Sequence, residues 1–230
     1  MEDLFNEIYG HEDVKQLFQF SIRSVKPIHI LLSGPPASGK TLFLMSLLKF
    51  PNSKYYLGGQ TSKAGLTEIL LREKPEYLII DESLIGDLMT LLNRQLDKMN
   101  SKDYDALLSL METGRVVRCK MKLWAEEQLN TKVYGACNYV EEIPQELLSR
   151  FLVVEFKEYT REEFINVSKH VLKVREGLSD EEAEAVSNML ADLTRDVRDS
   201  VKAGRLLKAG APMEMIRKLF RRGLNQKTLF

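Results

Sequence analysis

The sequence contains few of the residues that stabilise extracellular proteins or mark metal sites. Its 230 residues include two cysteines, three histidines and one tryptophan. Cys119 and Cys137 are well separated, and His11, His29 and His170 are scattered along the chain. Neither residue type therefore forms a disulfide framework or a metal-ligand motif. These shortages exclude small disulfide-rich secreted domains and zinc ribbons.

Long apolar segments are also missing. No apolar run approaches the ~20 residues that a membrane-spanning helix requires, so the sequence predicts no membrane partner. The chain starts with Met1, Glu2, Asp3 and Leu4, which is acidic where a secretory signal is basic. We therefore expect a reducing, cytoplasmic setting.

The net charge of the chain is zero, because it has 33 basic and 33 acidic residues. With 44% hydrophobic and 29% charged residues, the composition is typical of a folded globular protein and excludes a disordered one. The charge is nevertheless uneven, because the segment 202–230 holds only one acid, Glu214. This asymmetry indicates either a surface for an acidic partner or an ordinary solvated helical face. The basic residues of this segment are Lys202, Arg205, Lys208, Arg217, Lys218, Arg221, Arg222 and Lys227.

Residues 1 to 157 alternate between short apolar runs and helical stretches, which is typical of a parallel sheet with crossover helices. The expected strands are rich in β-branched or aromatic residues and are bounded by glycine, proline or charged residues. Two of them are nearly continuous apolar runs, as in strands that are covered on both faces. The five expected strands are 28–33, 54–57, 77–81, 132–138 and 151–156.

After Tyr159 the sequence shows helical patterns and no further strand patterns. Thr160 with Glu163 and Ser179 with Glu182 have the spacing of capping boxes that begin two helices. A third helix is predicted from 196 to 209.

A fourth helix is predicted to begin at Pro212 and to stop at Gly223. The predicted fold class is therefore α/β, with a five-stranded parallel sheet followed by a small four-helix domain. The expected domains are a nucleotide-binding domain at 1–157, a helical domain at 158–223 and a flexible tail at 224–230.

A phosphate-binding loop is the strongest motif in the chain. It satisfies G-x-x-x-x-G-K-[ST], with a predicted strand before it and a predicted helix after it. Its glycines allow backbone N–H groups to surround phosphate oxygens, and the helix N-terminus adds a favourable dipole. Lys40 is predicted to reach the β- and γ-phosphates of ATP, and the Thr41 hydroxyl to ligate Mg²⁺. The predicted nucleotide-binding residues here are Gly34, Pro35, Pro36, Ala37, Ser38, Gly39, Lys40, Thr41 and Leu42.

Two carboxylates follow the apolar strand 77–80. They lie at the carboxyl edge of the predicted sheet, where open α/β sheets bind their ligands. Asp81 is predicted to hold the Mg²⁺ shell, and Glu82 to orient or deprotonate the attacking water.

With these motifs in place, the chain resembles the AAA+ ATPases over nearly its whole length. Tyr9 and Gly10 lie in a segment similar to the adenine-contacting segment of that family. Asn138 ends a stretch like the sensor-1 strand, which implies that it helps to position the attacking water. Arg150 ends a segment that resembles the arginine-finger region, and Arg198 matches the sensor-2 arginine. Either arginine could instead form an ordinary surface ion pair.

The resemblance also implies an assembly. In AAA+ proteins the arginine finger reaches into the site of the neighbouring subunit, so the expected partner is a second copy of this chain in a ring, with a hexamer as the expected size. The implied cofactors are ATP and Mg²⁺, and the predicted helical domain corresponds to the lid of the family.

Two further stretches make the chain similar to the MCM and RuvB-like branch. Residues 57–67 resemble a segment that MCM helicases carry after the second strand, and 107–116 resemble the helix and hairpin before sensor 1 in MCM, MoxR and RuvB-like proteins. In helicases of this branch the hairpin meets the nucleic-acid backbone, so DNA is an implied partner. An edge hairpin whose lysines prevent aggregation is the alternative. The expected phosphate contacts are Arg115, Arg118, Lys120 and Lys122.

Two other segments lie outside the shared pattern. Residues 83–95 interrupt the MCM-like order, and their leucines predict an extended or additional helix. The end of the chain, from Gln226 to Phe230, loosely resembles a peptide that binds a sliding clamp.

The leading functional hypothesis is a ring-forming, ATP-hydrolysing AAA+ protein that moves or remodels DNA as a translocase or helicase. One alternative is a MoxR-like ATPase that remodels protein, which aromatic and apolar channel residues would favour. Another is a nucleotide-gated interaction or loader subunit with little turnover.

Overall fold

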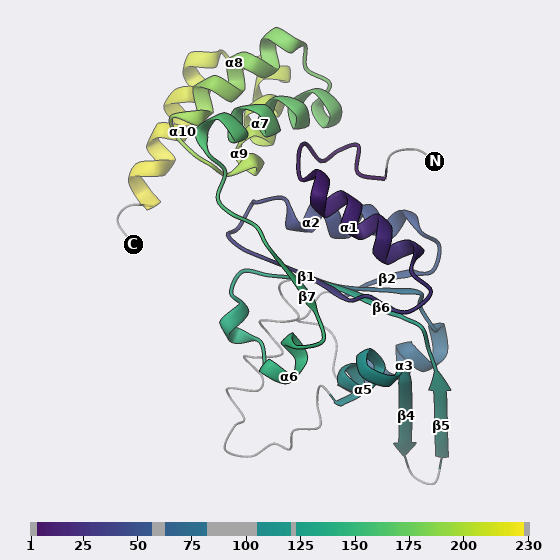
Figure 1. Cartoon of the computed structure of the whole chain (residues 1–230). Coiled ribbons are helices and arrows are strands. Elements are labelled where there is room, and N and C mark those ends of the chain that lie inside the picture. The colour runs from purple at the N-terminus through teal and green to yellow at the C-terminus, as the bar shows by residue number, and fades with distance from the viewer. Residues whose placement is uncertain (1–3, 57–62, 82–104, 121–122, 228–230) are drawn as a thin grey trace. The chain divides into compact units, whose positions relative to one another are not determined.

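The computed structural model describes residues 4–56, 63–81, 105–120 and 123–227 (Figure 1). The chain divides into two compact units. The helical unit contains Met1–Glu12, Pro35–Leu42 and Lys157–Phe230, and the sheet unit contains Asp13–Gly34 and Phe43–Phe156. The phosphate-binding loop thus groups with the helices of the second half of the chain. One junction between the units, at Phe156 and Lys157, falls where the sequence pattern changes from mixed to helical.

A parallel five-stranded sheet forms the centre of the sheet unit (Figure 1). The strand order is β2-β3-β6-β1-β7, and β1 pairs with both β6 and β7. Every predicted strand is confirmed, with small differences at the ends. Because the strands are parallel, their carboxyl ends share one edge of the sheet. The strands are β1 (Ile30–Ser33), β2 (Ser53–Tyr56), β3 (Tyr77–Ile80), β6 (Lys132–Cys137) and β7 (Leu152–Glu155).

Burial along the strands explains their sequences. Every residue of β1, β3 and β6 is buried, as the apolar runs predict for strands covered on both faces. The edge strand β7 is largely exposed instead, with Leu152 at 45% and Val153 at 39%.

Helices cover both faces of this sheet (Figure 1). On one face lie α1 (Glu12–Arg23) and the second half of α2 (Lys40–Ser46), which continues into the 3₁₀ helix η1 (Leu47–Lys49). Phe18 of α1 stacks on Phe43 of α2 with ring centroids 5.5 Å apart, and it also contacts Tyr134 of β6.

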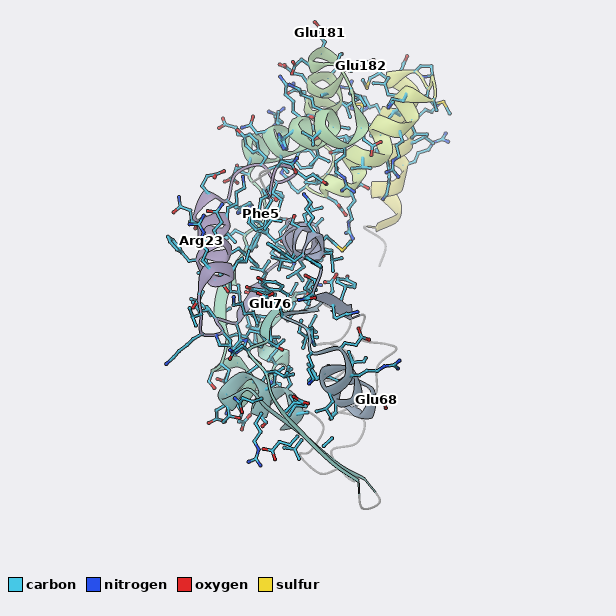
Figure 2. All side chains as sticks on the ribbon, turned by 90° about the vertical axis from the view of Figure 1, so that its right-hand side faces the viewer. Phe5, Arg23, Glu68, Glu76, Glu181 and Glu182 are labelled. Atoms are coloured by element: carbon cyan, nitrogen blue, oxygen red, sulfur yellow. The ribbon has the colours of Figure 1, made fainter. Side chains whose placement is uncertain are left out.

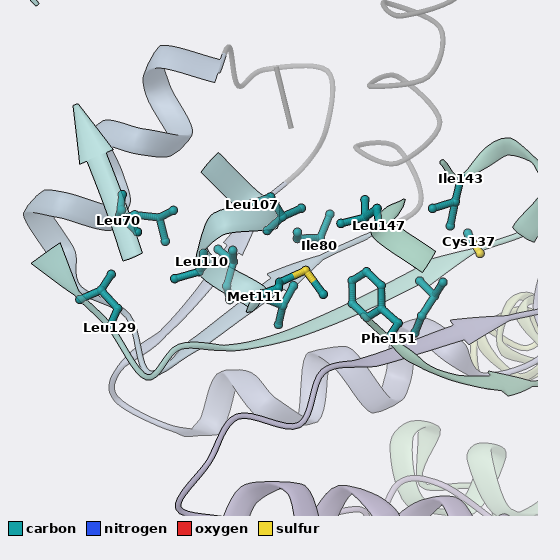
Figure 3. Close-up of a cluster of buried hydrophobic side chains, with 14 residues drawn as sticks. Leu70, Ile80, Leu107, Leu110, Met111, Leu129, Cys137, Ile143, Leu147 and Phe151 are labelled. Carbon is teal, nitrogen blue, oxygen red and sulfur yellow. The ribbon is translucent and has the colours of Figure 1, made fainter. Parts of the chain in front are cut away.

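The other face of the sheet carries an apolar cluster (Figure 3). It is covered by α3 (Lys63–Glu73), α5 (Asp105–Thr113), the 3₁₀ helix η3 (Val140–Glu142) and α6 (Gln145–Leu148). Leu110 of α5 is 1% exposed in this cluster, and truncation of such a core leucine to alanine costs about 2–5 kcal/mol. Other members of the cluster include Leu31, Leu70, Leu78, Ile80, Met111, Val133, Leu147 and Phe151.

The predicted hairpin is confirmed. Strands β4 (Arg115–Lys120) and β5 (Leu123–Gln128) pair antiparallel directly after α5. Gly114 joins helix to hairpin at φ +74°, where an added Cβ would lie 2.4 Å from the carbonyl oxygen of Leu129. A side chain at this junction would therefore displace the end of the hairpin.

Four helices follow Tyr159 in the helical unit: α7 (Arg161–Glu176), α8 (Asp180–Ala191), α9 (Val197–Lys208) and α10 (Met213–Lys227). Both predicted capping boxes are present, and each joins an N-cap hydroxyl to the third helical residue. Figure 2 shows Glu181 and Glu182 in the first turn of α8, where negative charge favours the helix dipole. An apolar cluster that includes Phe164, Leu190 and Ile216 packs the helices together.

The predicted end of the last helix is wrong. Helix α10 does not stop at Gly223 but runs to Lys227, so residues 224–227 form its last turn. An internal glycine costs only about 1 kcal/mol relative to alanine, and the residues that follow include good helix formers. The clamp-binding interpretation of 226–230 stays a prediction, because 228–230 lie outside the described residues.

Some predictions are not addressed by the structure. The insert 83–95 lies outside the described residues. Within the described ranges, no helix is both long and apolar enough to cross a membrane, and no cluster of three or more His, Cys, Asp or Glu residues is arranged to hold a metal ion.

His29 makes the stability of the sheet unit sensitive to acid. The ring is 6% exposed, and burial lowers its pKa from the ordinary value although a bond to Met111 opposes the shift. Its Nε2–H donates to the Met111 carbonyl at 3.2 Å, and its Nδ1 accepts the N–H of Val133 at 3.0 Å. Nδ1 accepts a bond only while the ring is neutral, so protonation would break the contact with Val133.

We therefore expect the free energy of unfolding to fall as the pH drops below about 6.5, because the unfolded chain then binds a proton that the folded chain excludes. The loss is at most ~1.4 kcal/mol per pH unit. Urea denaturation between about pH 7 and about pH 5 measures it. His29→Gln should flatten this dependence, whereas His170→Gln should retain it. An unchanged slope in His29→Gln would assign the acid sensitivity to other groups.

Candidate nucleotide-binding site

The phosphate-binding loop begins where β1 ends. Gly34 has φ +135°, and an added Cβ would lie 2.1 Å from the carbonyl oxygen of Phe156. Only glycine therefore fits between β1 and the chain that leaves β7. Further along the loop, Ala37 and Gly39 have φ +62° and +94°, so the backbone turns sharply before α2.

Lys40 is held inside the loop. It is 4% exposed, and its Nζ donates to the Pro35 carbonyl at 2.7 Å and to Ser38 Oγ at 3.4 Å. Ser38 Oγ also donates to the Pro35 carbonyl at 2.8 Å. The loop thus keeps one positive charge at its centre and binds it through neutral oxygen atoms.

Tyr159 contacts this loop from the start of the helical half, and no sequence motif identified it as a residue of the site. Its hydroxyl donates to the Ser38 carbonyl at 2.8 Å and lies 3.1 Å from where a Cβ on Gly39 would be. Burial raises the pKa of Tyr159 to about 12, with Glu163 adding to the shift, so the hydroxyl keeps its proton at neutral pH. The only signal in the sequence is the position of Tyr159 directly before a capping box.

A pocket of about 200 Å³ lies beside the loop within the helical unit. Tyr9 and Gly10 line it, so the predicted adenine-contacting residues border a real cavity. Tyr9 is 44% exposed, and its ring lies 5.7 Å from that of His170. The other lining residues, which the sequence argument did not identify, are His11, Lys157, Glu158, Tyr159, Glu163, Asn166 and Val167.

Arg198, the predicted sensor-2 residue, lies in the first turn of α9. Its side chain is exposed, and its Nε and Nη2 donate to the Asp196 carboxylate at 3.0 and 2.8 Å. Asp196 also caps α9 by accepting the backbone N–H of Arg198 at 2.9 Å. Arg198 therefore forms a local surface ion pair in this conformation. This was the alternative to a sensor-2 role in the sequence analysis.

The sheet unit carries the other predicted groups. Asp81 directly follows β3, and its Oδ2 accepts the hydroxyl of Tyr55 at 2.7 Å. Asn138 directly follows β6 and is half-buried. Since Ser33 pairs with Cys137, Asn138 and Gly34 leave neighbouring strands at the same level. Asp81 and Asn138 thus share the carboxyl edge of the sheet with the start of the loop.

Arg150, the predicted arginine finger, follows α6. Its Nη2 donates to Glu112 Oε2 at 2.7 Å, and its Nη1 donates to the Glu146 carbonyl. Its Nε is buried and has no hydrogen-bond partner within the described part of the chain. The guanidinium is therefore paired but incompletely satisfied.

The predicted nucleic-acid contacts on the hairpin are only partly described. Arg115 is bonded to Glu126 of the facing strand, with Nε 2.5 Å from Oε1. Arg118 and Lys120 are described only as backbone of β4, and Lys122 lies outside the described residues. Glu82 lies outside them as well.

The predicted residues therefore fall into two groups, one in each compact unit. The loop from Pro35 onward, Tyr9, Gly10 and Arg198 belong to the helical unit, whereas Gly34, Asp81, Asn138 and Arg150 belong to the sheet unit. The first group offers backbone N–H groups, a cation and an aromatic-lined pocket, which suit a nucleoside polyphosphate. The second group offers a carboxylate and an amide at a sheet edge, which suit a metal ion and an attacking water.

The sequence is similar to known proteins over most of its length. The chain matches the MCM P-loop domain over residues 1–175. It is 27% identical over 201 residues to the minichromosome maintenance protein MCM of Saccharolobus solfataricus, which covers 75% of this chain and 29% of that protein. It is 26% identical over 203 residues to the DNA replication licensing factor MCM7 of Arabidopsis thaliana, covering 74% and 28%. The chain thus spans less than a third of either relative.

The fold is also similar to a solved structure. A mutant of RuvB from Thermotoga maritima superposes with a TM-score of 0.64 at 21% identity, which covers 96% of this chain and 72% of that one. At 21% identity this similarity shows a shared fold only. The superposition includes both the sheet and the helices that follow it.

Proposed function

The chain belongs to the MCM P-loop domain family, and from this premise we propose that it is a Mg²⁺-dependent ATPase that acts on DNA as a subunit of a homo-oligomeric ring. The single observation that carries the ATPase proposal is the loop of residues 34–41, which surrounds a buried lysine and leads directly into a helix. The DNA proposal rests on less, namely the relatives named above and the distribution of basic side chains.

In the proposed site the loop holds the phosphates of ATP. Lys40 exchanges its bond to the Pro35 carbonyl for the β- and γ-phosphate oxygens, which accept a charge-assisted bond more strongly than a neutral carbonyl does. The adenine base occupies the pocket beside Tyr9 and Gly10. Tyr159 supports both regions, because it lines the pocket and bonds the loop.

The residues also fit a magnesium ion. Thr41 supplies a hydroxyl oxygen and Asp81 a carboxylate oxygen, which are the donors that Mg²⁺ prefers. Mg²⁺ is usually bound through one or two protein ligands together with phosphates and water, and the described residues contain no cluster that would hold a metal without a nucleotide. Once bound, the ion would neutralise charge on the phosphates. Asn138 and Glu82 are proposed to orient the attacking water.

Two arginines complete the proposal. Arg150 serves a neighbouring subunit as the arginine finger, and Arg198 senses the nucleotide from the helical unit. Both are held by carboxylates, at Glu112 and Asp196 respectively. Each must leave that carboxylate in order to reach a phosphate, so the proposal predicts that assembly and nucleotide binding change these ion pairs.

A basic face on α10 supports contact with DNA. Its four side chains are exposed, and within the described ranges none of them is joined to an acidic group. Uncompensated charge of this kind suits phosphate contacts. The hairpin contributes less than its sequence suggested, because Arg115 is neutralised by Glu126. The α10 basic face consists of Arg217, Lys218, Arg221 and Arg222.

The first test is steady-state ATP hydrolysis by the purified chain, alone and with single-stranded, duplex and branched DNA. We expect DNA to stimulate turnover, with a stimulation that fades as salt rises. Glu82→Gln is the blank, because it should retain bound ATP without hydrolysing it. Turnover that is indifferent to every DNA would contradict the DNA proposal and favour protein remodelling. An absence of turnover would favour a loader-type subunit.

Neutralising the α10 basic face with four glutamines should weaken DNA binding uniformly across sequences, because phosphates carry no sequence information. Each phosphate contact that is lost should reduce the slope of log affinity against log salt by about 1. Fluorescence anisotropy at several salt concentrations measures this slope. The control replaces Arg205 and Lys208 by glutamine, since these cations are already bonded to Glu176. Because the control removes two charges and the test variant four, an equal effect per substituted residue would assign the loss to net charge alone.

A further inference from the structure

Tyr55 and Asp81 are brought together by the register of two strands. Tyr55 of β2 pairs with Ile79 of β3, so the two side chains point to the same face of the sheet. Asp81 follows Ile79 by two residues and thus returns to that face. Two residues of strand span about 6.6 Å, a distance that the long side chain of tyrosine can bridge. The hydroxyl accordingly donates to Asp81 Oδ2 at 2.7 Å.

This contact is a strong hydrogen bond. Its length of 2.7 Å lies within the range for a hydroxyl that donates to a carboxylate, where the charge of the acceptor strengthens the bond. Both groups are half-buried, which limits competition from water. The aromatic ring is anchored in β2, and the bond therefore restricts the rotamer of the carboxylate.

We propose that Tyr55 is the positioning residue for the Asp81 carboxylate, and that it holds this carboxylate in the orientation in which it binds the shell of the magnesium ion. The inference rests on the proposed function, in which Asp81 supports Mg²⁺. Tyr55 does not contact the metal or the nucleotide in this scheme. Its hydrogen bond keeps the carboxylate from rotating freely. The carboxylate is therefore already ordered when the metal binds.

Loss of a side chain that orients a metal ligand typically costs 10- to 100-fold in metal affinity. Tyr55→Phe keeps the ring and removes only the hydroxyl, so we expect about a 10-fold higher Mg²⁺ concentration at half-saturation. Affinity for the nucleotide without metal should stay unchanged, because the phosphates and the base are held by other residues.

Tyr77→Phe is the matched control. Tyr77 lies at the amino end of β3, where burial and the neighbouring Glu76 carboxylate raise the pKa of its hydroxyl. The change therefore removes a tyrosine hydroxyl from β3, the strand that Asp81 follows, at the end opposite Asp81. The measurement is an Mg²⁺ titration of the binding of a fluorescent, non-hydrolysable ATP analogue, repeated in the presence of EDTA. Thermal unfolding of each variant monitors its folding.

The outcomes separate the inference from the proposed function. A higher Mg²⁺ midpoint in Tyr55→Phe and in Asp81→Asn, with Tyr77→Phe like the wild type, supports the inference. A shift in Asp81→Asn alone overturns the role of Tyr55 but retains the metal at Asp81. Similar shifts in both tyrosine variants overturn the inference, since the effect is then a general loss of strand stability. No shift in Asp81→Asn refutes the proposed metal ligand, and the role of Tyr55 with it.

Discussion

Replacing Lys40 by alanine is expected to abolish measurable ATP binding. Its ammonium is buried inside the loop and already donates to oxygen atoms, so it needs little rearrangement to donate to phosphate oxygens. Hydrogen bonds that involve a charged group contribute about 1.5–3 kcal/mol each. Loss of bonds to two phosphates would thus weaken binding by about 100-fold or more.

Titration of a fluorescent ATP analogue measures this loss. Lys26→Ala is a suitable control, because Lys26 is an exposed lysine outside the loop. Thermal unfolding of Lys40→Ala checks that the variant is folded. Binding of Lys40→Ala at the wild-type affinity would show that the loop does not hold the nucleotide.

The features that could be predicted from the sequence are those that depend on residues close together in the chain. The loop requires glycines, lysine and threonine at set spacings, and it is found where predicted. Each capping box joins residues three positions apart, such as Thr160 and Glu163, and both are present. The five strands were recognisable because they are short, rich in β-branched or aromatic residues and bounded by glycine, proline or charged residues.

The contacts that the sequence did not predict join residues that are far apart in the chain. Tyr159 and Ser38 are separated by 121 positions, and Tyr55 and Asp81 by 26. Such pairs depend on strand order and register, which periodicity alone does not provide. Glu126 similarly follows the basic stretch in sequence, but the hairpin register returns it to Arg115 and neutralises that charge.

The wrong end of α10 has a different origin. A glycine indicates the end of a helix because it readily adopts positive φ. The cost of keeping it within a helix is nevertheless only about 1 kcal/mol. Packing of Ile216 and Phe220 against the other helices is of larger magnitude, since one buried side chain of this size contributes about 1.5–3 kcal/mol. Local preference at Gly223 therefore did not decide where the helix ends.

Replacing Arg150 by alanine is expected to reduce ATP turnover by about 10³- to 10⁵-fold while ATP binding is retained. An arginine finger stabilises charge that develops on the γ-phosphoryl group during transfer, and its removal has effects of this size. Turnover and analogue binding measured on the same preparation separate the two steps. Wild-type turnover in Arg150→Ala would refute the assignment.

The ion pair with Glu112 allows a purely structural role of Arg150 to be tested. If Arg150 served only to bind Glu112, then Glu112→Gln would reproduce the loss, because it removes the charge that Nη2 contacts. We expect Glu112→Gln to retain turnover instead, since a finger must leave this carboxylate before it reaches a phosphate.

Mixing two inactive variants tests whether Arg150 acts across a subunit boundary. Lys40→Ala has a defective loop but an intact Arg150, whereas Arg150→Ala has an intact loop but no finger. In a mixed ring, a Lys40→Ala subunit can present its arginine to the loop of an Arg150→Ala neighbour. Turnover that appears only on mixing would therefore place Arg150 in the site of the adjacent subunit. If the mixture stays inactive although the two variants co-assemble, Arg150 acts within its own subunit, and the ring is not required for hydrolysis.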